Sequence, residues 1–422
     1  MKTIVKNGRV FDGEALTRQD ILIEDGLIQA VGLGLDETGC QTIDAQGQIV
    51  SPGFVDLHVH LRDPGFAHKE TVETGSMAAA AGGFTTICAM PNLNPVPDSP
   101  EHLQVSLDRI QEGAGVRALP YCSITEGEKG EKLVDFEALA GKCAGFSDDG
   151  KGMQRGEMMR QAMIRCAKLD ALICAHCEDE SLLDGGYIHQ GEYAALHGHK
   201  GICSASEYEQ VRRDAAYALE TGCRYHVCHV SAKETLEIVR QAKAAGARVS
   251  CEITPHHALL CDMDIAGDEG RFKMNPPLRS AEDRAAIWRA LRDGTADAFA
   301  TDHAPHSAEE KSRGLAGSAM GIVGLETAFP VLYTGLVKKG ILSIERLLWM
   351  LTYGPSRVLG IPCGVVPGNR ADLVFIDENT IDVVDSRRFY SMGKSTPFEG
   401  METQGRVVRT VCQGKTVYRE ER

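Results

Sequence analysis

The sequence predicts an α/β protein in which a (β/α)8 barrel carries a small composite β-sandwich domain formed by both chain ends. Strand-like segments alternate with helical segments through the middle of the chain, a pattern typical of βα units and a parallel sheet. Eight such units fit a barrel of about 250 residues. Short alternating runs separated by glycine turns occupy the two ends. A doubly wound sheet is the structural alternative for the central part.

The two ends of the chain share a pattern of short β-strands. In residues 1–50, Asp25-Gly26 is a hairpin signal between alternating runs, and in residues 361–422 Gln413-Gly414 supplies a similar turn. We expect the two ends to pair into one small β domain around a barrel of residues 51–360. The strands predicted at the ends are Thr3–Val5, Asp20–Ile23, Ile28–Val31, Ala371–Ile376, Val407–Cys412 and Lys415–Tyr418.

The central region alternates between runs of strand type and runs of helix type. The predicted barrel strands are Val55–His60, Thr85–Met90, Arg117–Ser123, Ala144–Ser147, Ala171–Ala175, Tyr225–Val230, Arg248–Ile253 and Ala296–Thr301. The predicted helices are Glu70–Ala81, Glu101–Gln111, Asp135–Lys142, Arg155–Lys168, Ser206–Glu220, Ala232–Ala245 and Ala281–Arg292. Helices lie between most pairs of strands, as a barrel requires.

Composition limits the classes of protein and partner. The 422 residues can bury a large core, and 45 basic against 59 acidic residues give a formal net charge of −14. An acidic surface argues against a nucleic-acid or anionic-membrane partner. No apolar run approaches the ~20 residues of a membrane span, and the N-terminus lacks a signal-peptide pattern. The fourteen scattered cysteines favour free thiols in a reducing compartment. We therefore expect a cytoplasmic protein.

The most informative stretch is Ile49–Gly65, which reads IVSPGFVDLHVHLRDPG. Its centre alternates apolar and polar residues with period two, as a strand with two different faces does. Asp56, His58, His60 and Arg62 share the polar face. Two imidazoles two residues apart on a strand project in parallel and can reach one metal ion together. A half-buried strand whose polar face meets solvent is the alternative for such a motif taken alone.

Residues with ligand chemistry follow the ends of most predicted strands. In a barrel the C-terminal strand ends converge on one face, where active sites form. Imidazole and carboxylate together favour zinc, with manganese or cobalt as substitutes, and a carboxylate can bridge two ions. The pattern therefore predicts a site for one or two divalent metals. The residues at these strand ends are His58, His60, Asn92, Asp149, His176, His229, Asp302 and His306.

Each of these residues also has a purely structural interpretation. Asp149 lies in Asp-Asp-Gly, an excellent turn sequence. His176 and His229 could be hydrogen-bonded core histidines, and Asp302 could cap a turn. Taken singly, these interpretations are at least as good as the metal-ligand one. Taken together, at matching strand ends, the residues favour the metal site.

Four motifs carry a resemblance to a known family. They are His58-Val-His60-Leu-Arg62-Asp-Pro-Gly65, Met90-Pro-Asn92, Met274-Asn-Pro-Pro-Leu-Arg279 and Ala300-Thr-Asp302-His-Ala-Pro-His306. They resemble the motifs of bacterial dihydroorotases, which belong to the amidohydrolase superfamily of metal-dependent (β/α)8 barrels. The resemblance covers nearly the whole chain, including a composite β domain. The His-x-His motif alone marks only the superfamily, whereas the combination is much more specific.

The resemblance implies two zinc ions per subunit, bridged by Asp149. Many superfamily members use a carboxylated lysine as the bridge, and no lysine stands at this position. The chain is therefore similar to the dihydroorotase class that uses aspartate, which weakens the case for hydantoinase-like or allantoinase-like relatives. The further ligands implied are His58, His60 and Asp302 for one ion and His176 and His229 for the other.

The activity implied by the resemblance is the reversible cyclisation of N-carbamoyl-L-aspartate to L-dihydroorotate plus water, in de novo pyrimidine (UMP) biosynthesis. A metal-bridging hydroxide would be the nucleophile in the hydrolytic direction. Asp302 would act as general base and then as general acid. The substrate would be bound by His60, Arg62, Asn92, Asn275, His306, Met320 and Gly321.

Three features near these motifs leave more than one interpretation open. Residues 311–321, KSRGLAGSAMG, are either a mobile lid over the site or an ordinary surface loop. Cys177 could approach a metal when the pocket is empty, although strand alternation favours a buried thiol that points away. His256 and His257 follow the seventh strand, and nothing assigns them a ligand role.

Two other functions remain open at this stage. A different cyclic-amide hydrolase, such as a hydantoinase, needs no clamp for a carboxylate, so Arg62, Asn92 and His306 argue against it. A catalytically dead barrel serving as a structural partner would be expected to lose metal ligands, and none of the six is missing here. The partner in that case would be aspartate transcarbamoylase, and association with it is also conceivable for an active enzyme. For such a barrel we expect a homodimer.

Overall fold

The computed structural model describes residues 2–420, and a closed barrel of parallel strands lies at its centre. One sheet has the order β6-β7-β8 and another the order β14-β13-β12-β9. Isolated bridges join the two sheets, because Phe146 pairs with Cys122 and with Ile173, and Val59 pairs with His303. The barrel strands are β6 (Phe54–Val59), β7 (Phe84–Ala89), β8 (Arg117–Pro120), β9 (Leu172–Ala175), β12 (Arg224–Val227), β13 (Val249–Ile253) and β14 (Ala298–Phe299).

The fourth predicted strand, residues 144–147, is not a regular strand in the structure. Phe146 alone pairs with both neighbours, and the chain turns away immediately after it. Asp148 explains the turn, because its carboxylate accepts hydrogen bonds from the main-chain amides of Ile124 (2.7 Å) and Thr125 (3.1 Å). These bonds hold the end of the segment against the preceding loop, while Ala144 and Phe146 still donate main-chain hydrogen bonds to Pro120 and Leu172. The place of a fourth strand in the barrel is kept, but its length is reduced to one residue, which is bridged on both sides.

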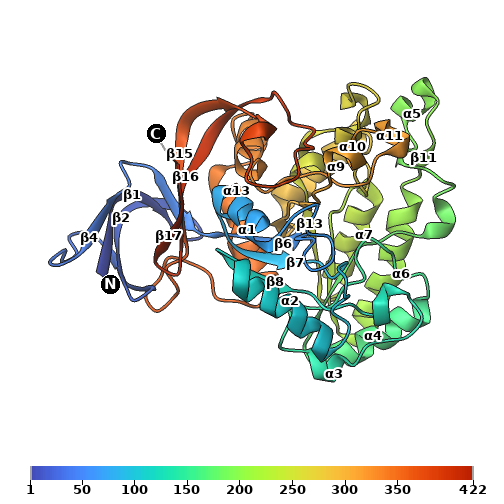
Figure 1. Cartoon of the computed structure of the whole chain (residues 1–422), viewed down its shortest axis with the longest axis horizontal. Coiled ribbons are helices and arrows are strands. Elements are labelled where there is room, and N and C mark those ends of the chain that lie inside the picture. Colours follow the sequence, from blue (N-terminus) through green and yellow to red (C-terminus); the bar gives the residue numbers. More distant parts are fainter. Residues whose placement is uncertain (1, 421–422) are drawn as a thin grey trace.

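The predicted helices form and surround the barrel (Figure 1). Their starts have local causes: Ser99 and Ser280 are N-caps whose side chains accept main-chain amides of the first turn, and Pro100 occupies the first position of its helix. The helices are α1 (Val72–Ala81), α2 (Pro100–Gly113), α3 (Phe136–Leu139), α4 (Gly156–Lys168), α6 (Ala205–Thr221), α7 (Lys233–Ala244) and α9 (Ala281–Asp293). After the last barrel strand, α13 (Ile344–Leu351) and α14 (Tyr353–Leu359) complete the ring.

Strands from both ends of the chain form one eight-stranded sheet beside the barrel, at the left of Figure 1. The central junction is antiparallel pairing of β5 with β15, in which Leu373 lies opposite Pro52. The prediction that the two ends pair is confirmed, whereas the proposed limits 1–50, 51–360 and 361–422 stay a prediction. The strands of this sheet are β1 (Lys2–Phe11), β2 (Leu16–Glu24), β3 (Leu27–Gly32), β4 (Gln41–Asp44), β5 (Ile49–Pro52), β15 (Leu373–Val383), β16 (Glu402–Cys412) and β17 (Lys415–Arg419).

Two segments extend from the strand ends. Between β9 and β12 the chain forms β10 (Ile188–His189), α5 (Glu192–His197) and β11 (Gly201–Ile202), and after β14 it forms the short helices α10 (Ala308–Lys311) and α11 (Gly314–Gly317). These lie together at the right of Figure 1, away from the composite sheet. Among residues 2–420, no helix combines the length and apolar character needed to cross a membrane.

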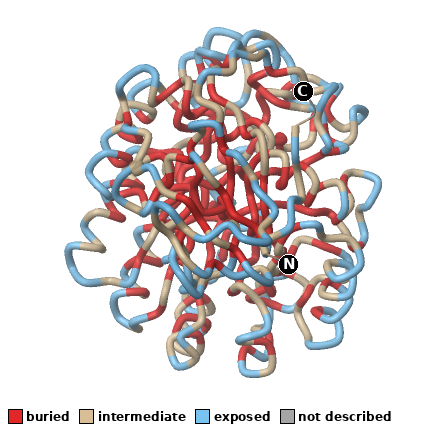
Figure 2. The backbone as a smooth tube through the Cα atoms, turned by 90° about the vertical axis from the view of Figure 1, so that its left-hand side faces the viewer, coloured by how far each residue is buried: buried red, intermediate tan, exposed pale blue. Residues whose placement is uncertain are grey.

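Both faces of the barrel strands are buried, and Figure 2 shows the buried backbone gathered at the centre of the molecule. Every residue of β6 is buried, including Asp56 and His58. The polar residues of this strand are therefore shielded from water, and the alternative of a solvent-facing strand is wrong. Phe54, at the start of β6, contacts the rings of Phe84 and Phe329 at centroid distances of 5.6 and 5.8 Å.

We expect Phe54→Ala to lower the free energy of unfolding by about 3–5 kcal/mol, because it leaves a cavity among fully buried rings. Urea unfolding followed by circular dichroism measures the change. Leu33→Ala is the matched control, since Leu33 is 69% exposed, and it should leave the unfolding midpoint unchanged. Equal effects of the two substitutions would contradict this account of the core.

Candidate metal centre at the C-terminal ends of the barrel strands

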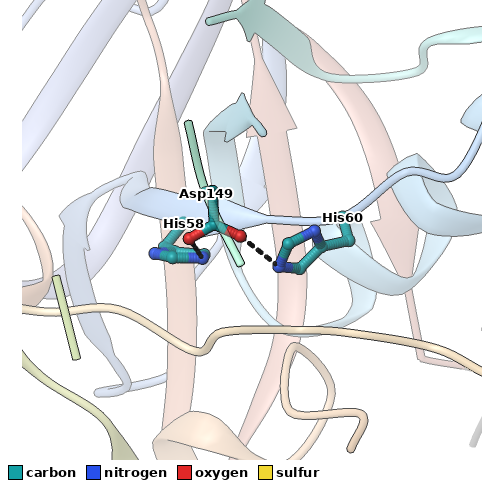
Figure 3. Close-up of side chains that lie close together, drawn as sticks. All are labelled: His58, His60 and Asp149. Atoms are coloured by element: carbon teal, nitrogen blue, oxygen red, sulfur yellow. Dashed lines mark ion pairs between the residues drawn. The ribbon is translucent and has the colours of Figure 1, made fainter. Parts of the chain in front are cut away.

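Strand β6 delivers two imidazoles to the same carboxylate. His58 Nε2 lies 3.3 Å from Asp149 Oδ1, and His60 Nε2 lies 3.4 Å from Asp149 Oδ2. Figure 3 shows the carboxylate between the two rings, one oxygen toward each. The period of two along the strand explains why both rings face the same side, and the turn after Phe146 brings Asp149 to them.

Asp149 also faces the histidines of two other strand ends. Asp149 Oδ1 is 3.9 Å from His229 Nε2, which in turn is 3.0 Å from His176 Nδ1. Possible ligand atoms within 4.8 Å of one another form one group of His58, His60 and Asp149 and another of Asp149, His176 and His229. Asp149 is the member that the two groups share, which is the position of a bridging ligand.

Asp302 completes the cluster from the end of β14. Its Oδ1 lies 3.3 Å from His60 Nε2 and 3.5 Å from His58 Nε2. Asp56 holds the end of β14 against β6, because its carboxylate accepts a hydrogen bond of 2.6 Å from the Thr301 hydroxyl. All six sequence-predicted metal ligands therefore lie together in one buried cluster.

Three residues in the cluster or beside it have strained backbones. Arg62, His229 and Asp302 have φ values of 61°, 33° and 48°, in the left-handed region that side-chain-bearing residues seldom adopt. Such conformations cost on the order of 1–3 kcal/mol each and persist where the surroundings over-determine them. These residues follow strand ends, and their conformations direct the side chains toward the cluster. Strain of this kind is typical of functional sites.

The charges of the cluster favour ionised carboxylates. Burial alone would raise the pKa of Asp149, but His58, His229 and His60 outweigh it and hold that pKa well below its usual range. The pKa of Asp302 is also lowered, because the hydrogen bond from His60 and the nearby imidazoles overcome its burial. Burial and the neighbouring Arg62 lower the pKa of His60, which favours the neutral ring that metals bind.

The cluster fits a divalent cation. His58 Nε2 and Asp149 Oδ1 are buried and have no hydrogen-bond partner in the described part of the chain. Unsatisfied buried polar atoms cost about 1–3 kcal/mol each, and a cation among them would satisfy both. Four imidazoles and two carboxylates are the donor types that zinc and similar divalent ions prefer. The residues therefore support the binding of divalent metal.

Several supporting contacts were not predicted from the sequence. His60 Nδ1 donates a hydrogen bond of 2.9 Å to Asn92 Oδ1, which turns Nε2 toward the cluster. Glu252 Oε1 lies 3.2 Å from His58 Nδ1, and its other oxygen accepts a bond of 3.0 Å from His226. The signal for the last two was present in the sequence, since Glu252 and His226 are ionisable residues within the predicted strands Arg248–Ile253 and Tyr225–Val230.

A positively charged group lies next to the cluster. Arg62 donates to the carbonyl of Pro305 (3.2 Å), and its guanidinium lies 3.3 Å from His306 Nε2. Lys69, which the sequence gave no reason to include, donates to His306 Nδ1 at 3.4 Å. Burial and these two cations lower the pKa of His306 to about 3, so its ring is neutral near pH 7. The group offers the Arg62 guanidinium beside the metal ligands, and the Lys69 ammonium next to it lies 2.8 Å from Glu310 Oε1.

The remaining predicted substrate residues line the same region. Asn275 Nδ2 donates a bond of 2.9 Å to Glu178 Oε1 and lies 3.5 Å from His176 Nε2. The carbonyl of Met320 accepts a hydrogen bond of 2.8 Å from His306 Nε2. Gly321 follows with φ of 135°, and a side chain there would collide with the carbonyl of Ala304 at 2.7 Å, so glycine is required.

The segment 311–321 is fastened at its base. The Lys311 ammonium donates to the carbonyls of Lys273 (3.0 Å), Ala319 (2.8 Å) and Gly321 (2.7 Å). These bonds pin the two ends of the segment to each other and to the barrel. Whether the residues between them open and close over the site stays a prediction.

Cys177 points away from the cluster, as strand alternation predicted. Its thiol lies 3.1 Å from the hydroxyl of Tyr225 in the core outside the barrel strands. His257 bonds Thr254 and the carbonyl of Pro276, which is a structural role. His256 is buried beside it, and its Nε2 has no hydrogen-bond partner among the described residues.

Comparisons with known proteins agree with this geometry. A family model described as dihydro-orotase-like matches residues 47–235. A protein of Geobacillus sp. (strain WCH70) named dihydroorotase is 50% identical over the full length of both chains. A dihydroorotase of Halalkalibacterium halodurans is 49% identical, with 100% of this chain and 99% of that protein covered.

Solved structures extend the likeness to other cyclic-amide enzymes. The L-hydantoinase (dihydropyrimidinase) from Arthrobacter aurescens superimposes with a TM-score of 0.89 at 28% identity, covering 100% of this chain and 96% of that one. Dihydropyrimidinase from Brevibacillus agri NCHU1002, at 22% identity and a TM-score of 0.88, shares the fold over 99% of this chain and 95% of that one. With half of its residues identical to a relative of equal length, the chain belongs to the dihydroorotase family of amidohydrolase barrels.

Proposed function

We propose that this protein is a metal-dependent dihydroorotase, which interconverts L-dihydroorotate and N-carbamoyl-L-aspartate in pyrimidine biosynthesis. The observation that carries the proposal is that a metal-ligand cluster and a cationic group lie side by side in one site. A buried cluster of imidazoles and carboxylates fits divalent metal, and the cations Arg62 and Lys69 lie beside it. Full-length relatives at about half identity are named dihydroorotase, which supports the same activity.

We further propose that the site holds two zinc ions. Asp149 would bridge them, because it belongs to both groups of ligand atoms. Bound zinc would supply Lewis-acid polarisation of the substrate carbonyl and would lower the pKa of water toward neutrality. The remaining ligands would be His58, His60 and Asp302 for one ion and His176 and His229 for the other.

Asp302 is the proposed proton carrier. Its lowered pKa leaves the carboxylate ionised at neutral pH, so it can accept a proton from the attacking water. Water adds to the ring amide carbon, the carbon–nitrogen bond breaks, and the ring nitrogen takes the proton from Asp302. In the biosynthetic direction the same carboxylate removes a proton from the ureido nitrogen, which closes the ring and releases water.

The substrate carboxylate would be bound by Arg62 and held in place by the residues around it. Arg62 offers charge-assisted hydrogen bonds in a water-poor site, where such bonds are strong. His306 connects Arg62 to the main chain of Met320, so the predicted lid and the anion site are in contact. We assign the substrate-binding role to His60, Arg62, Asn92, Asn275, His306, Met320 and Gly321.

Further proposals concern where the protein works and with what. The fourteen cysteines are free, which supports a reducing compartment such as the cytoplasm. The substrate is a small molecule, and the acidic chain supports no nucleic-acid partner. A homodimer and association with aspartate transcarbamoylase are proposals that oligomer-mass measurements and co-purification would test.

We expect Asp302→Asn to fold normally and to lose dihydroorotate turnover by about 10²–10⁴-fold, because the amide cannot carry the proton. Turnover is measured by absorbance in both directions, together with metal content and circular dichroism of each protein. A wild-type protein without bound metal or without turnover would overturn the proposed function. Full activity of the variant would remove Asp302 from its role while leaving the function intact.

We expect Arg62→Met to reduce kcat/KM for dihydroorotate by roughly 10–150-fold, the value of a lost hydrogen bond to a charged group. The control is a second substrate, dihydrouracil, which has the same ring without the carboxylate. Its turnover, slower than that of dihydroorotate, should be the same in wild type and in Arg62→Met. This comparison also separates dihydroorotase from hydantoinase activity. Equal losses on both substrates would show that Arg62 does not read the carboxylate.

We expect the pH profile of kcat/KM to contain no ionisation from His306. Because the pKa of His306 is lowered to about 3, the ring is neutral above that pH and its charge does not change between pH 5 and 9. His306→Asn should lower kcat/KM at every pH by the same factor and leave the shape of the profile unaltered. An acidic limb near pH 6.5 that disappears in the variant would contradict this prediction.

A further inference from the structure

We propose that Glu252 is a positioning residue of the metal centre: it fixes the ring of His58 and the main chain of His229, so that ligands from two strand ends face the metals. The inference rests on the proposed function, because it assumes that the cluster holds metal. Glu252 lies in β13, inside the barrel and below the ligands, and it is fully buried. Neither the sequence motifs nor the roles assigned above include it.

The first step concerns His58. Its two ring nitrogens face opposite ways, with Nε2 toward Asp149 and Asp302 and Nδ1 toward Glu252 Oε1 at 3.2 Å. A neutral imidazole carries one N–H, and a carboxylate at Nδ1 draws the proton to that nitrogen. Nε2 then keeps the free electron pair that a metal needs. Glu252 thereby selects the tautomer of His58 that can bind.

The second step concerns His229. The same oxygen of Glu252 accepts a hydrogen bond of 3.3 Å from the main-chain amide of His229. This residue has a φ of 33°, a strained conformation that needs support from its surroundings. His58 and His229 belong to the two separate ligand groups. One carboxylate oxygen therefore couples the ring of a ligand in one group to the backbone of a ligand in the other.

The third step explains how Glu252 keeps its own orientation. Its Oε2 accepts a hydrogen bond of 3.0 Å from His226 Nε2, and His226 Nδ1 contacts the hydroxyl of Ser250 at 2.8 Å. The Glu252 and His226 side chains are inaccessible to solvent. A buried glutamate and histidine are costly in a barrel interior that apolar residues could fill. If Glu252 and His226 only filled space in the core, their series of hydrogen bonds would not need to end at the metal ligand His58.

The experiment compares three variants of the full-length protein. Glu252→Leu removes the acceptor at similar volume, and Glu252→Gln keeps one oxygen for His58 and His229. Cys228→Ser is the matched control, since the Cys228 sulfur lies within 4.8 Å of the ligand atoms of His58 and Glu252, but no hydrogen bond joins it to either residue in the described part of the chain. Each protein is loaded with Co²⁺ or Zn²⁺. Metal release to a chromophoric chelator and the visible absorption spectrum of Co²⁺ are then recorded.

We expect Glu252→Leu to weaken metal binding by about 10–100-fold and to alter the Co²⁺ spectrum, the range found for residues that orient metal-bound histidines. Glu252→Gln should restore most of the affinity, and Cys228→Ser should behave as wild type. Wild-type affinity and spectrum in a folded Glu252→Leu protein would overturn the inference. So would an equal loss in Cys228→Ser, which would indicate a general disturbance of the barrel interior.

Two further controls keep the result interpretable. If Glu252→Leu does not fold, the double variant Glu252→Leu/His226→Leu replaces the whole buried pair with apolar groups, which is often neutral for stability. Its metal affinity should fall by the same factor, and unchanged affinity would again overturn the inference. If wild-type protein binds no metal at all, the proposed function fails, and this outcome is distinct from failure of the positioning role.

Discussion

The buried carboxylate of Asp149 needs imidazole partners close to it, and the barrel has to bring those partners together. A carboxylate buried in a protein interior costs several kcal/mol unless partners surround it. Its partners His58, His60 and His229 come from two strands far apart in the sequence. Only a closed barrel, with Val59 bridged to His303 at the seam, brings these strand ends to one point.

Local sequence patterns were sufficient for the architecture and for the positions of the predicted ligands. The period of two in Phe54–Val59 assigns His58 and Asp56 to one face, and the alternation of strands and helices implies a parallel barrel. Given a barrel, the C-terminal strand ends meet, so ligand-type residues at those ends have to be neighbours. The pairing of the two chain ends followed from their shared pattern of short strands and turns.

Contacts between side chains on different strands were beyond such patterns. The alternating pattern of the strand predicts the face on which Glu252 lies, but it does not predict which imidazoles the Glu252 oxygens contact. For the same reason, the hydrogen bond from His60 Nδ1 to Asn92 Oδ1, which turns His60 toward the cluster, was missed as a positioning contact. The loss of the strand at residues 144–147 depends on Asp148 capturing amides of a neighbouring loop, which is a tertiary event. Lys69 reaches His306 only because of how the loops fold.

The seam between β5 and β15 has a consequence for how this chain is made. During synthesis, β5 leaves the ribosome early, but its antiparallel neighbour belongs to the last part of the polypeptide. At roughly 5–20 residues per second, one edge of the N-terminal sheet waits on the order of tens of seconds for that neighbour. An open strand edge is a template for pairing with other chains. Nascent copies crowded on one messenger RNA are thus most exposed to mutual aggregation before the C-terminal strands emerge.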